Sequence, residues 1–236
     1  MPNERSGTTA GHQLGHSPRR YGRGMDAVVF DLDGVLVDSE LTWDEVRRAV
    51  VADHGGSWTA EATRAMQGMS TPEWARYLVE KLGVRLTPDR IAAAVIDGMA
   101  QRYAGGPPVL PGAPEAVRAV GERYPVAIAS SSPPVLIRAF LEATGLTGVV
   151  GVALSSEQVA AGKPAPDVYL EAARRLGVVP GRCAAVEDTT NGLRAALAAG
   201  MTVYAVPNPH FPPDPAVLER AHQVLTTVAD LPTALG

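Results

Sequence analysis

Residues 26–39 decide the fold of this chain, and their sequence reads DAVVFDLDGVLVDS. Residues 27–30 are apolar without alternation, which is typical of a strand buried on both faces of a parallel sheet. The apolar run stops at Asp31, and a second acid, Asp33, follows with Gly34 behind it. Side chains at i and i+2 of a strand share a face, about 6.6 Å apart, and a bend at Gly34 can bring both carboxylates toward one point. Because unpaired buried carboxylates are costly, the pattern indicates a cation-binding site at the carboxyl end of a strand.

The bulk composition narrows the class of protein. The 236 residues are 46% hydrophobic, which is enough for a sizeable core. The 21 basic and 25 acidic side chains give a net charge of -4, without the basic stripe that is typical of nucleic-acid binding. Cys183 is the only cysteine and lies in an apolar run, so we expect a buried inert thiol in a reducing compartment.

The sequence also bears on location and assembly. No apolar run reaches the length of about 20 residues that spans a bilayer. Residues 1–24 lack the hydrophobic segment of a signal peptide and are rich in Gly, Ser, Arg and His, which predicts a disordered tail. We therefore expect a cytoplasmic protein, monomeric or weakly dimeric, that binds neither membrane nor nucleic acid.

Two kinds of periodicity follow the tail. Residues 39–104 carry apolar stripes at helical spacing, and Thr71-Pro72 reads as an N-cap followed by proline at the first helical position. In residues 105–236, apolar strand-like runs alternate with helical segments, which predicts a doubly wound parallel sheet. We therefore expect an α/β core domain, formed by residues 25–38 and 105–236, with residues 39–104 inserted as a helical cap domain.

Polar residues follow further strand-like runs or loops of the predicted sheet. Ser130 ends one run, Lys163 lies in a loop after the next, and Glu187 and Asp188 end a third. The carboxyl ends of parallel strands open on one edge of a sheet, so these residues are expected to meet the two acids of the first strand. Each residue alone has an ordinary explanation: Ser130 as a turn residue, Lys163 as a solvated one and Asp188 as a helix cap. Together and in this order they indicate a catalytic site.

The four polar segments resemble the motifs of the haloacid dehalogenase-like (HAD) hydrolases, and the resemblance covers nearly the whole chain past residue 24. The matching segments are DLDGVLVDSE at 31–40, VAIAS at 126–130, GKPAPD at 162–167 and VEDTTNG at 186–192. The resemblance implies that Asp31 is the nucleophile that becomes an aspartyl-phosphate. It implies that Asp33 protonates the leaving oxygen and then deprotonates the attacking water. Ser130, Ser131 and Lys163 are the implied phosphate-binding residues.

The same resemblance implies a Mg²⁺ site. Its implied ligands are Asp31, the backbone carbonyl of Asp33 and Asp188, with Glu187 in or next to the coordination shell. The chemistry of the residues agrees, because a carboxylate attacks an anionic phosphate only when a cation removes the repulsion between them. Mg²⁺ prefers oxygen ligands, and the five His residues and the single Cys form no clustered set for a softer metal.

The second acid favours transfer from a phosphate ester, because the dehalogenases, transport ATPases and phosphonoacetaldehyde hydrolases of the family lack an acid where this chain has Asp33. We therefore expect a phosphatase of small phosphorylated metabolites, including sugar phosphates. A sugar-phosphate mutase of the β-phosphoglucomutase type is the alternative. Such mutases carry a cap histidine where this chain has Trp43, and a cap arginine where it has Thr71.

Two further expectations concern the cap and the class of protein. Trp43, Met69, Ser70 and Thr71 are the cap residues expected to select the substrate. A non-catalytic binding protein on the same fold is a third interpretation, since fold does not imply function. It is disfavoured because every expected catalytic position is filled.

Overall fold

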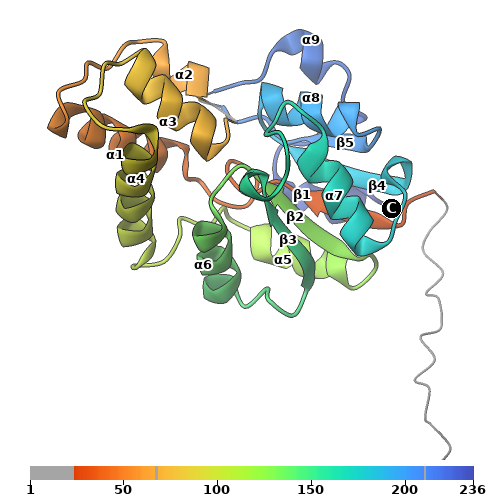
Figure 1. Cartoon of the computed structure of the whole chain (residues 1–236). Helices are drawn as coiled ribbons and strands as arrows, with labels where there is room; N and C mark the ends of the chain where they lie inside the picture. Colours follow the sequence, from red (N-terminus) through yellow and green to blue (C-terminus); the bar gives the residue numbers. More distant parts are fainter. Residues whose placement is uncertain (1–23, 67–68, 210) are drawn as a thin grey trace, which may run out of the picture.

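The computed structural model describes residues 24–66, 69–209 and 211–236. In this part of the chain, six parallel strands form one sheet in the order β3-β2-β1-β4-β5-β6 (Figure 1). The strands are β1 (Ala27–Phe30), β2 (Val126–Ser130), β3 (Val150–Ser155), β4 (Cys183–Glu187), β5 (Thr202–Ala205) and β6 (Gln223–Val224). The α/β class with a doubly wound parallel sheet is therefore confirmed. The predicted tail lies, except for Gly24, outside the described residues.

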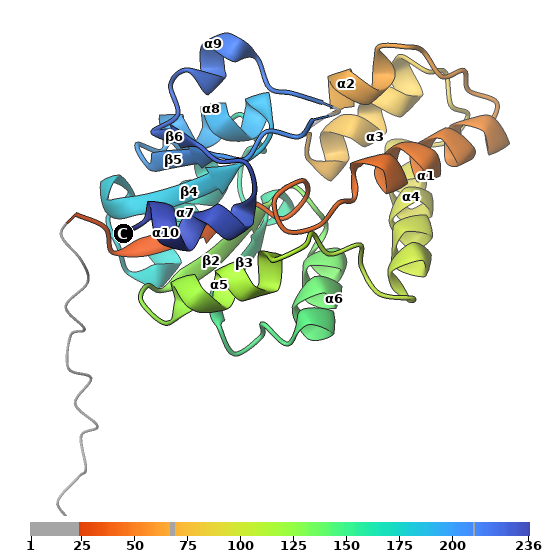
Figure 2. The ribbon, with the colours of Figure 1, turned by 180° about the vertical axis from the view of Figure 1, so that it is seen from behind.

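Helices cover both faces of the sheet. On one face lie α7 (Asp167–Leu176), α8 (Thr190–Ala198) and α9 (Pro215–Leu218), and on the other lie α5 (Ala113–Gly121), α6 (Pro134–Thr144) and α10 (Leu231–Ala234) (Figures 1 and 2). Short 3-10 turns stand at η1 (Ser156–Gln158), η2 (Pro180–Arg182) and η3 (Val228–Asp230). In β1, Val28 and Phe30 pack on the α5 side, whereas Ala27 and Val29 pack on the α7 side. The unbroken apolar run of β1 is explained by this double coverage.

The chain between β1 and α5 forms helices α1 (Glu40–Asp53), α2 (Ala62–Met66), α3 (Thr71–Glu80) and α4 (Pro88–Tyr103), which lie beside the sheet in both views (Figures 1 and 2). Their apolar stripes are buried, as the periodicity predicts; Ile91 and Met99, for example, are fully buried. The predicted cap of α3 is wrong by one residue. Ser70, not Thr71, is the N-cap, and its backbone N–H and hydroxyl both donate to the Glu73 carboxylate.

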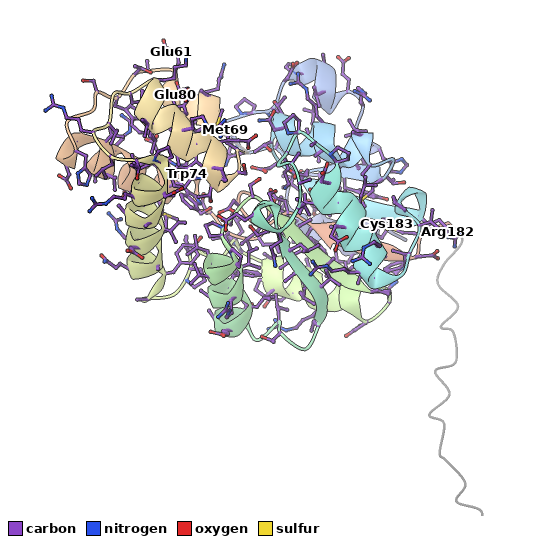
Figure 3. All side chains as sticks on the ribbon, in the orientation of Figure 1. Glu61, Met69, Trp74, Glu80, Arg182 and Cys183 are labelled. Carbon is purple, nitrogen blue, oxygen red and sulfur yellow. The ribbon has the colours of Figure 1, made fainter. Side chains whose placement is uncertain are left out.

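The amino ends of the strands lie away from these helices. Figure 3 shows Arg182 and Cys183 at the end of the sheet that is far from Met69 and Trp74. Cys183 is buried, as predicted, and burial raises the pKa of its thiol to about 11. Among the described residues, no helix combines the length and apolarity needed to cross a membrane.

Candidate active site

The neighbouring strands β1 and β4 bring the acids together. Phe30 pairs with Val186, and the Asp31 N–H donates to the Val186 carbonyl at 2.9 Å. The residues that follow each strand therefore leave the sheet side by side. Carboxylate oxygens of Asp31, Glu187 and Asp188 lie within 4.8 Å of one another, and all three side chains are buried. This is the convergence at the carboxyl edge that the strand-end pattern predicts.

Lys163 reaches the same point from the loop before α7. Its Nζ lies 2.9 Å from Asp31 Oδ1 and 2.6 Å from Glu187 Oε1, and its side chain is buried. Burial alone lowers the pKa of Lys163, but Asp31 and Glu187 together raise it above its ordinary value. Lys163 is therefore a fixed ammonium between two carboxylates and not a solvated surface residue.

The Glu187 carboxylate is fully engaged by protein donors. Oε1 accepts from Lys163 and, at 2.6 Å, from the Tyr169 hydroxyl, while Oε2 accepts from the backbone N–H of Asp188 at 3.1 Å. A Cβ at Gly192 would overlap this carboxylate, so the first turn of α8 packs directly on it. Glu187 thus holds Lys163 in place and is itself held by backbone.

Asp188 has the opposite environment. Its side chain is 1% exposed, yet its Oδ1 has no hydrogen-bond partner among the described residues. It does not cap α8, because the hydroxyl of Thr189 accepts from the Gly192 N–H in that role. Burial raises the pKa of Asp188 well above its usual range, and Glu187 and Asp31 raise it further. An unsatisfied buried oxygen among like charges is expected where a cation binds.

The excess of negative charge in the acid cluster also favours a bound cation. Burial raises the pKa of Asp31 to about 8, Glu187 adds to the rise, and Lys163 opposes it. Within the described chain, Lys163 is the one cation in ion-pair contact with this group of three carboxylates. An oxygen-only donor set with excess negative charge fits a hard divalent cation such as Mg²⁺.

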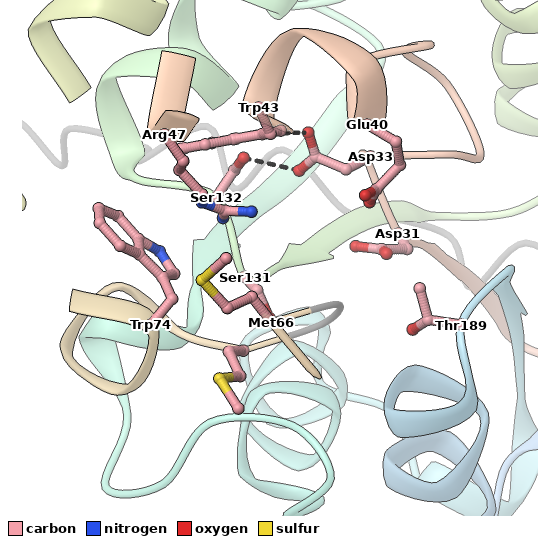
Figure 4. Close-up of a pocket in the computed structure, with 11 residues that line it drawn as sticks. Asp31, Asp33, Glu40, Trp43, Arg47, Met66, Trp74, Ser131, Ser132 and Thr189 are labelled. Carbon is pink, nitrogen blue, oxygen red and sulfur yellow. Dashed lines mark hydrogen bonds between the residues drawn. The ribbon is translucent and has the colours of Figure 1, made fainter. Parts of the chain in front are cut away.

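Asp33 leaves the acid cluster and faces the helices between β1 and β2. Its Oδ1 accepts from the Ser39 hydroxyl and, at 3.1 Å, from Trp43 Nε1. Its Oδ2 accepts from the Ser132 hydroxyl at 2.6 Å (Figure 4). The Ser130 hydroxyl donates to the same oxygen at 3.4 Å. The second acid is therefore placed by donors from β2, from the loop after it and from the start of α1.

A small cavity of about 40 Å³ lies between Asp31 and helices α1 to α3 (Figure 4). Its lining residues are Asp31, Asp33, Glu40, Trp43, Arg47, Met66, Met69, Trp74, Ser131, Ser132 and Thr189. That volume holds only a few waters. The cavity lies directly against Asp31, between the sheet edge and helices α1 to α3.

The residues predicted from the sequence separate into two groups in the structure. Trp43, Met69 and Ser131 line the cavity, along with both acids of the first motif. The other predicted residues do not line it. Ser130, Lys163, Glu187 and Asp188 are buried around the acid cluster and Asp33, while Ser70 and Thr71 are buried at the start of α3.

Sequence reasoning missed several residues of the site. Ser132 is the third serine of the run after β2 and was within reach of the strand-end argument. Tyr169 carried no such signal, because it belongs to the apolar face of α7. Glu40 and Arg47 line the cavity from α1, where burial raises the pKa of Glu40 to about 7. Their helical spacing does not distinguish them from surface charges.

Gly34 is required where the chain turns after β1. Its φ is +78°, and a Cβ there would overlap the Asp188 carboxylate. We expect Gly34→Ala to lower the free energy of unfolding by about 2–5 kcal/mol, from the left-handed backbone and the overlap together. Gly83 has a φ of +72° with open space around it, so Gly83→Ala is the matched control and should cost only about 1–2 kcal/mol. Urea denaturation measures both, and equal losses would show that the contact with Asp188 is unimportant.

The fold and this cluster of acids define an α/β protein with a buried acidic site at the carboxyl edge of its sheet. Residues 25–200 match the haloacid dehalogenase-like hydrolases. The chain belongs to this family.

Relatives of known name support the same assignment. Protein CbbY of Cupriavidus necator is 35% identical over 203 residues, which cover 78% of this chain and 78% of that protein. The phosphorylated carbohydrates phosphatase of Thermotoga maritima is 32% identical over 184 residues, covering 77% of this chain and 85% of that protein. The crystal structure of CbbY from Rhodobacter sphaeroides in complex with phosphate superposes with a TM-score of 0.77 at 26% identity, covering 88% of this chain and 96% of that one.

Proposed function

We propose that this protein is a Mg²⁺-dependent phosphatase that hydrolyses small phosphorylated metabolites, sugar phosphates among them, through an aspartyl-phosphate intermediate. The observation that carries the proposal is the position of Lys163 Nζ, 2.9 Å from Asp31 Oδ1 in a buried cluster of acids. An ammonium at this point reduces the repulsion between the carboxylate and an anionic phosphate. Relatives that are named phosphatases over most of this chain's length support the reaction class.

Each residue of the proposed reaction has one task. Asp31 Oδ attacks phosphorus, and the bond from phosphorus to the ester oxygen breaks. Asp33 gives its proton to that oxygen, so the alcohol leaves neutral. Asp33 then takes a proton from water, which attacks phosphorus and returns Asp31 as a carboxylate with release of phosphate. Lys163, Ser130 and Ser131 hold the phosphoryl oxygens throughout.

Asp31, Asp188 and the backbone carbonyl of Asp33 are the proposed Mg²⁺ ligands, with Glu187 next to the coordination shell because its oxygens already accept from protein donors. When bound, the ion neutralises charge on the phosphoryl oxygens and lowers the barrier to attack. The unpartnered Asp188 Oδ1 supports this ligand set.

Helices α1–α4 are proposed to act as a cap domain on a core made of the remaining strands and helices. The cap side chains that face Asp31 would select the leaving group, and closure would exclude bulk water from the intermediate. The position of Trp43 and Met69 in the lining of the cavity supports this role. Ser70 and Thr71 would act through the position of α3.

The proposal is tested by phosphate release from p-nitrophenyl phosphate and from a panel of sugar phosphates, with Mg²⁺ and with a chelator. We expect turnover only with Mg²⁺. The same assay on β-glucose 1-phosphate separates the alternatives: a mutase forms glucose 6-phosphate without free phosphate. Absence of turnover on every substrate with Mg²⁺ present would contradict the proposal and favour a non-catalytic role.

A further inference from the structure

Arg47 is a buried cation that the proposed reaction does not use. It projects from α1 into the cavity and is 9% exposed. Its Cζ lies 4.7 Å from the ring centroid of Trp43 and 5.1 Å from that of Trp74. The centroids of the two rings are 6.1 Å apart, so the rings contact each other and the guanidinium lies against both of them. Figure 4 shows this group on the side of the cavity opposite Thr189.

Arg47 has no close ion-pair partner. Among the described residues, no carboxylate oxygen lies within 4.0 Å of its guanidinium and its buried Nε has no hydrogen-bond acceptor, although Glu40, Asp33 and Asp44 favour its charged form from a greater distance. Its neighbour Arg48 shows the usual arrangement, with an exposed side chain 2.5 Å from Asp44. A buried guanidinium without a partner is costly, and binding sites are where proteins keep such a group.

The position of Arg47 identifies the part of the substrate that it faces. Trp43 packs on Arg47 and donates from Nε1 to Asp33 Oδ1, so the guanidinium lies next to the acid proposed to protonate the leaving oxygen. Asp31 and Lys163 lie beyond Asp33 on the phosphoryl side. A group on the leaving alcohol would therefore meet Arg47, whereas the transferred phosphoryl group meets Lys163.

From this geometry we infer that the preferred substrate is a phosphate ester whose leaving group carries a second anion, a carboxylate or a second phosphate, bound by Arg47. The inference rests on the proposed phosphatase function and names its substrate class. Arginine binds both anions through paired N–H donors, and contact with the two tryptophan rings limits the movement of the guanidinium. Glu40 and Asp33 also face this space, and they would repel an anion that is not seated on the guanidinium.

Two substrate pairs test the inference and separate the two kinds of anion. 3-Phosphoglycerate against glycerol 3-phosphate tests a carboxylate, and fructose 1,6-bisphosphate against fructose 1-phosphate tests a second phosphate. We expect the wild type to favour the anionic member of one pair by about tenfold to a hundredfold in kcat/KM, the size of a charge-assisted hydrogen bond. Arg47→Met should reduce that ratio to one or below, because Glu40 and Asp33 then repel the second anion, and Arg47→Lys should restore part of the preference.

The matched control is Arg48→Met on the same helix, which should keep the wild-type ratio because Arg48 is an exposed residue outside the cavity. Equal kcat/KM values within both pairs for the wild type would overturn the inference. So would an Arg47→Met protein that keeps the preference.

A binding measurement tests the role of Arg47 in anion binding independently of catalytic turnover. Tryptophan fluorescence reports binding of the same four compounds to Asp31→Asn protein, because Trp43 and Trp74 contact Arg47. The anionic member of one pair should bind at least tenfold more tightly, and Arg47→Met added to this protein should abolish the difference. If binding shows the difference while no compound is hydrolysed by wild type, the phosphatase proposal fails and the anion site stands. Equal binding within both pairs overturns the anion site, whatever the activity.

Discussion

Asp31→Asn should lower the rate of phosphate release by about 10⁵-fold or more, because the amide oxygen is too weak a nucleophile to form the covalent intermediate. The substitution keeps the shape of the side chain, and its neighbours Lys163 and Glu187 remain in place. A steady-state assay of p-nitrophenyl phosphate with saturating Mg²⁺ measures the effect.

The control for this variant is Asp26→Asn, at the other end of β1. Asp26 forms a surface ion pair with Arg182, and a loss of that pair is worth at most about 1 kcal/mol. Its turnover should equal that of the wild type. Thermal unfolding should show Asp31→Asn to be no less stable than the wild type without metal, since the amide removes a charge from a crowded acid cluster. An Asp31→Asn protein with wild-type activity would show that Asp31 is not the nucleophile.

Asp188→Asn should abolish Mg²⁺ dependence and, with it, most of the activity. In the wild type, Mg²⁺ at 100 times its dissociation constant should stabilise the folded state by about 2.7 kcal/mol. The variant should lose this stabilisation because the unpartnered Oδ1 is the proposed ligand. Activity should fall by about 10³-fold or more, as for other losses of transition-state charge stabilisation.

The same variant has an expected effect on stability without metal. Burial and Glu187 raise the pKa of Asp188 in the folded protein above its unfolded value. The folded state therefore holds the proton more tightly, and stability falls as the pH rises above the unfolded pKa. At pH 8 in a chelator, the neutral side chain of Asp188→Asn escapes that loss. Its Tm should equal or exceed that of the wild type, whereas a lower Tm with an unchanged Mg²⁺ shift would exclude Asp188 as a ligand.

The central elements of the fold follow from sequence pattern because parallel strands buried on both faces read as apolar runs. Residues 27–30 show this, and the acids behind them fall at the sheet edge by the register of β1 with β4. Boundaries are less well determined by local chemistry. Ser70 and Thr71 can each cap a helix, and only the bond to Glu73 selects Ser70. Helix α9 was not predicted, because its four residues, 215–218, follow a proline-rich stretch and show no full turn of periodicity.

The site is predictable in part for a similar reason. Asp31, Glu187 and Asp188 follow strands, so topology alone brings them together. Arg47 carries no such signal: it stands beside Arg48 in the sequence, and only the packing of α1 against Trp74 of α3 buries one and leaves the other exposed. The sequence thus predicts where the acidic residues lie at the sheet edge. The positions of the side chains proposed to select a substrate depend on packing between helices, which the sequence does not reveal.

The central claim is that Asp31 becomes phosphorylated, and acid quenching of Asp33→Asn protein during turnover of p-nitrophenyl phosphate tests it most directly. The nitrophenolate leaves with little help from an acid, but the attacking water needs Asp33, so the intermediate should accumulate. Mass spectrometry of the digested protein should then find one added phosphoryl group on the peptide that contains Asp31, and none on the same peptide of the protein that also carries Asp31→Asn. Phosphate release without any such adduct, or an adduct on another residue, would contradict the account.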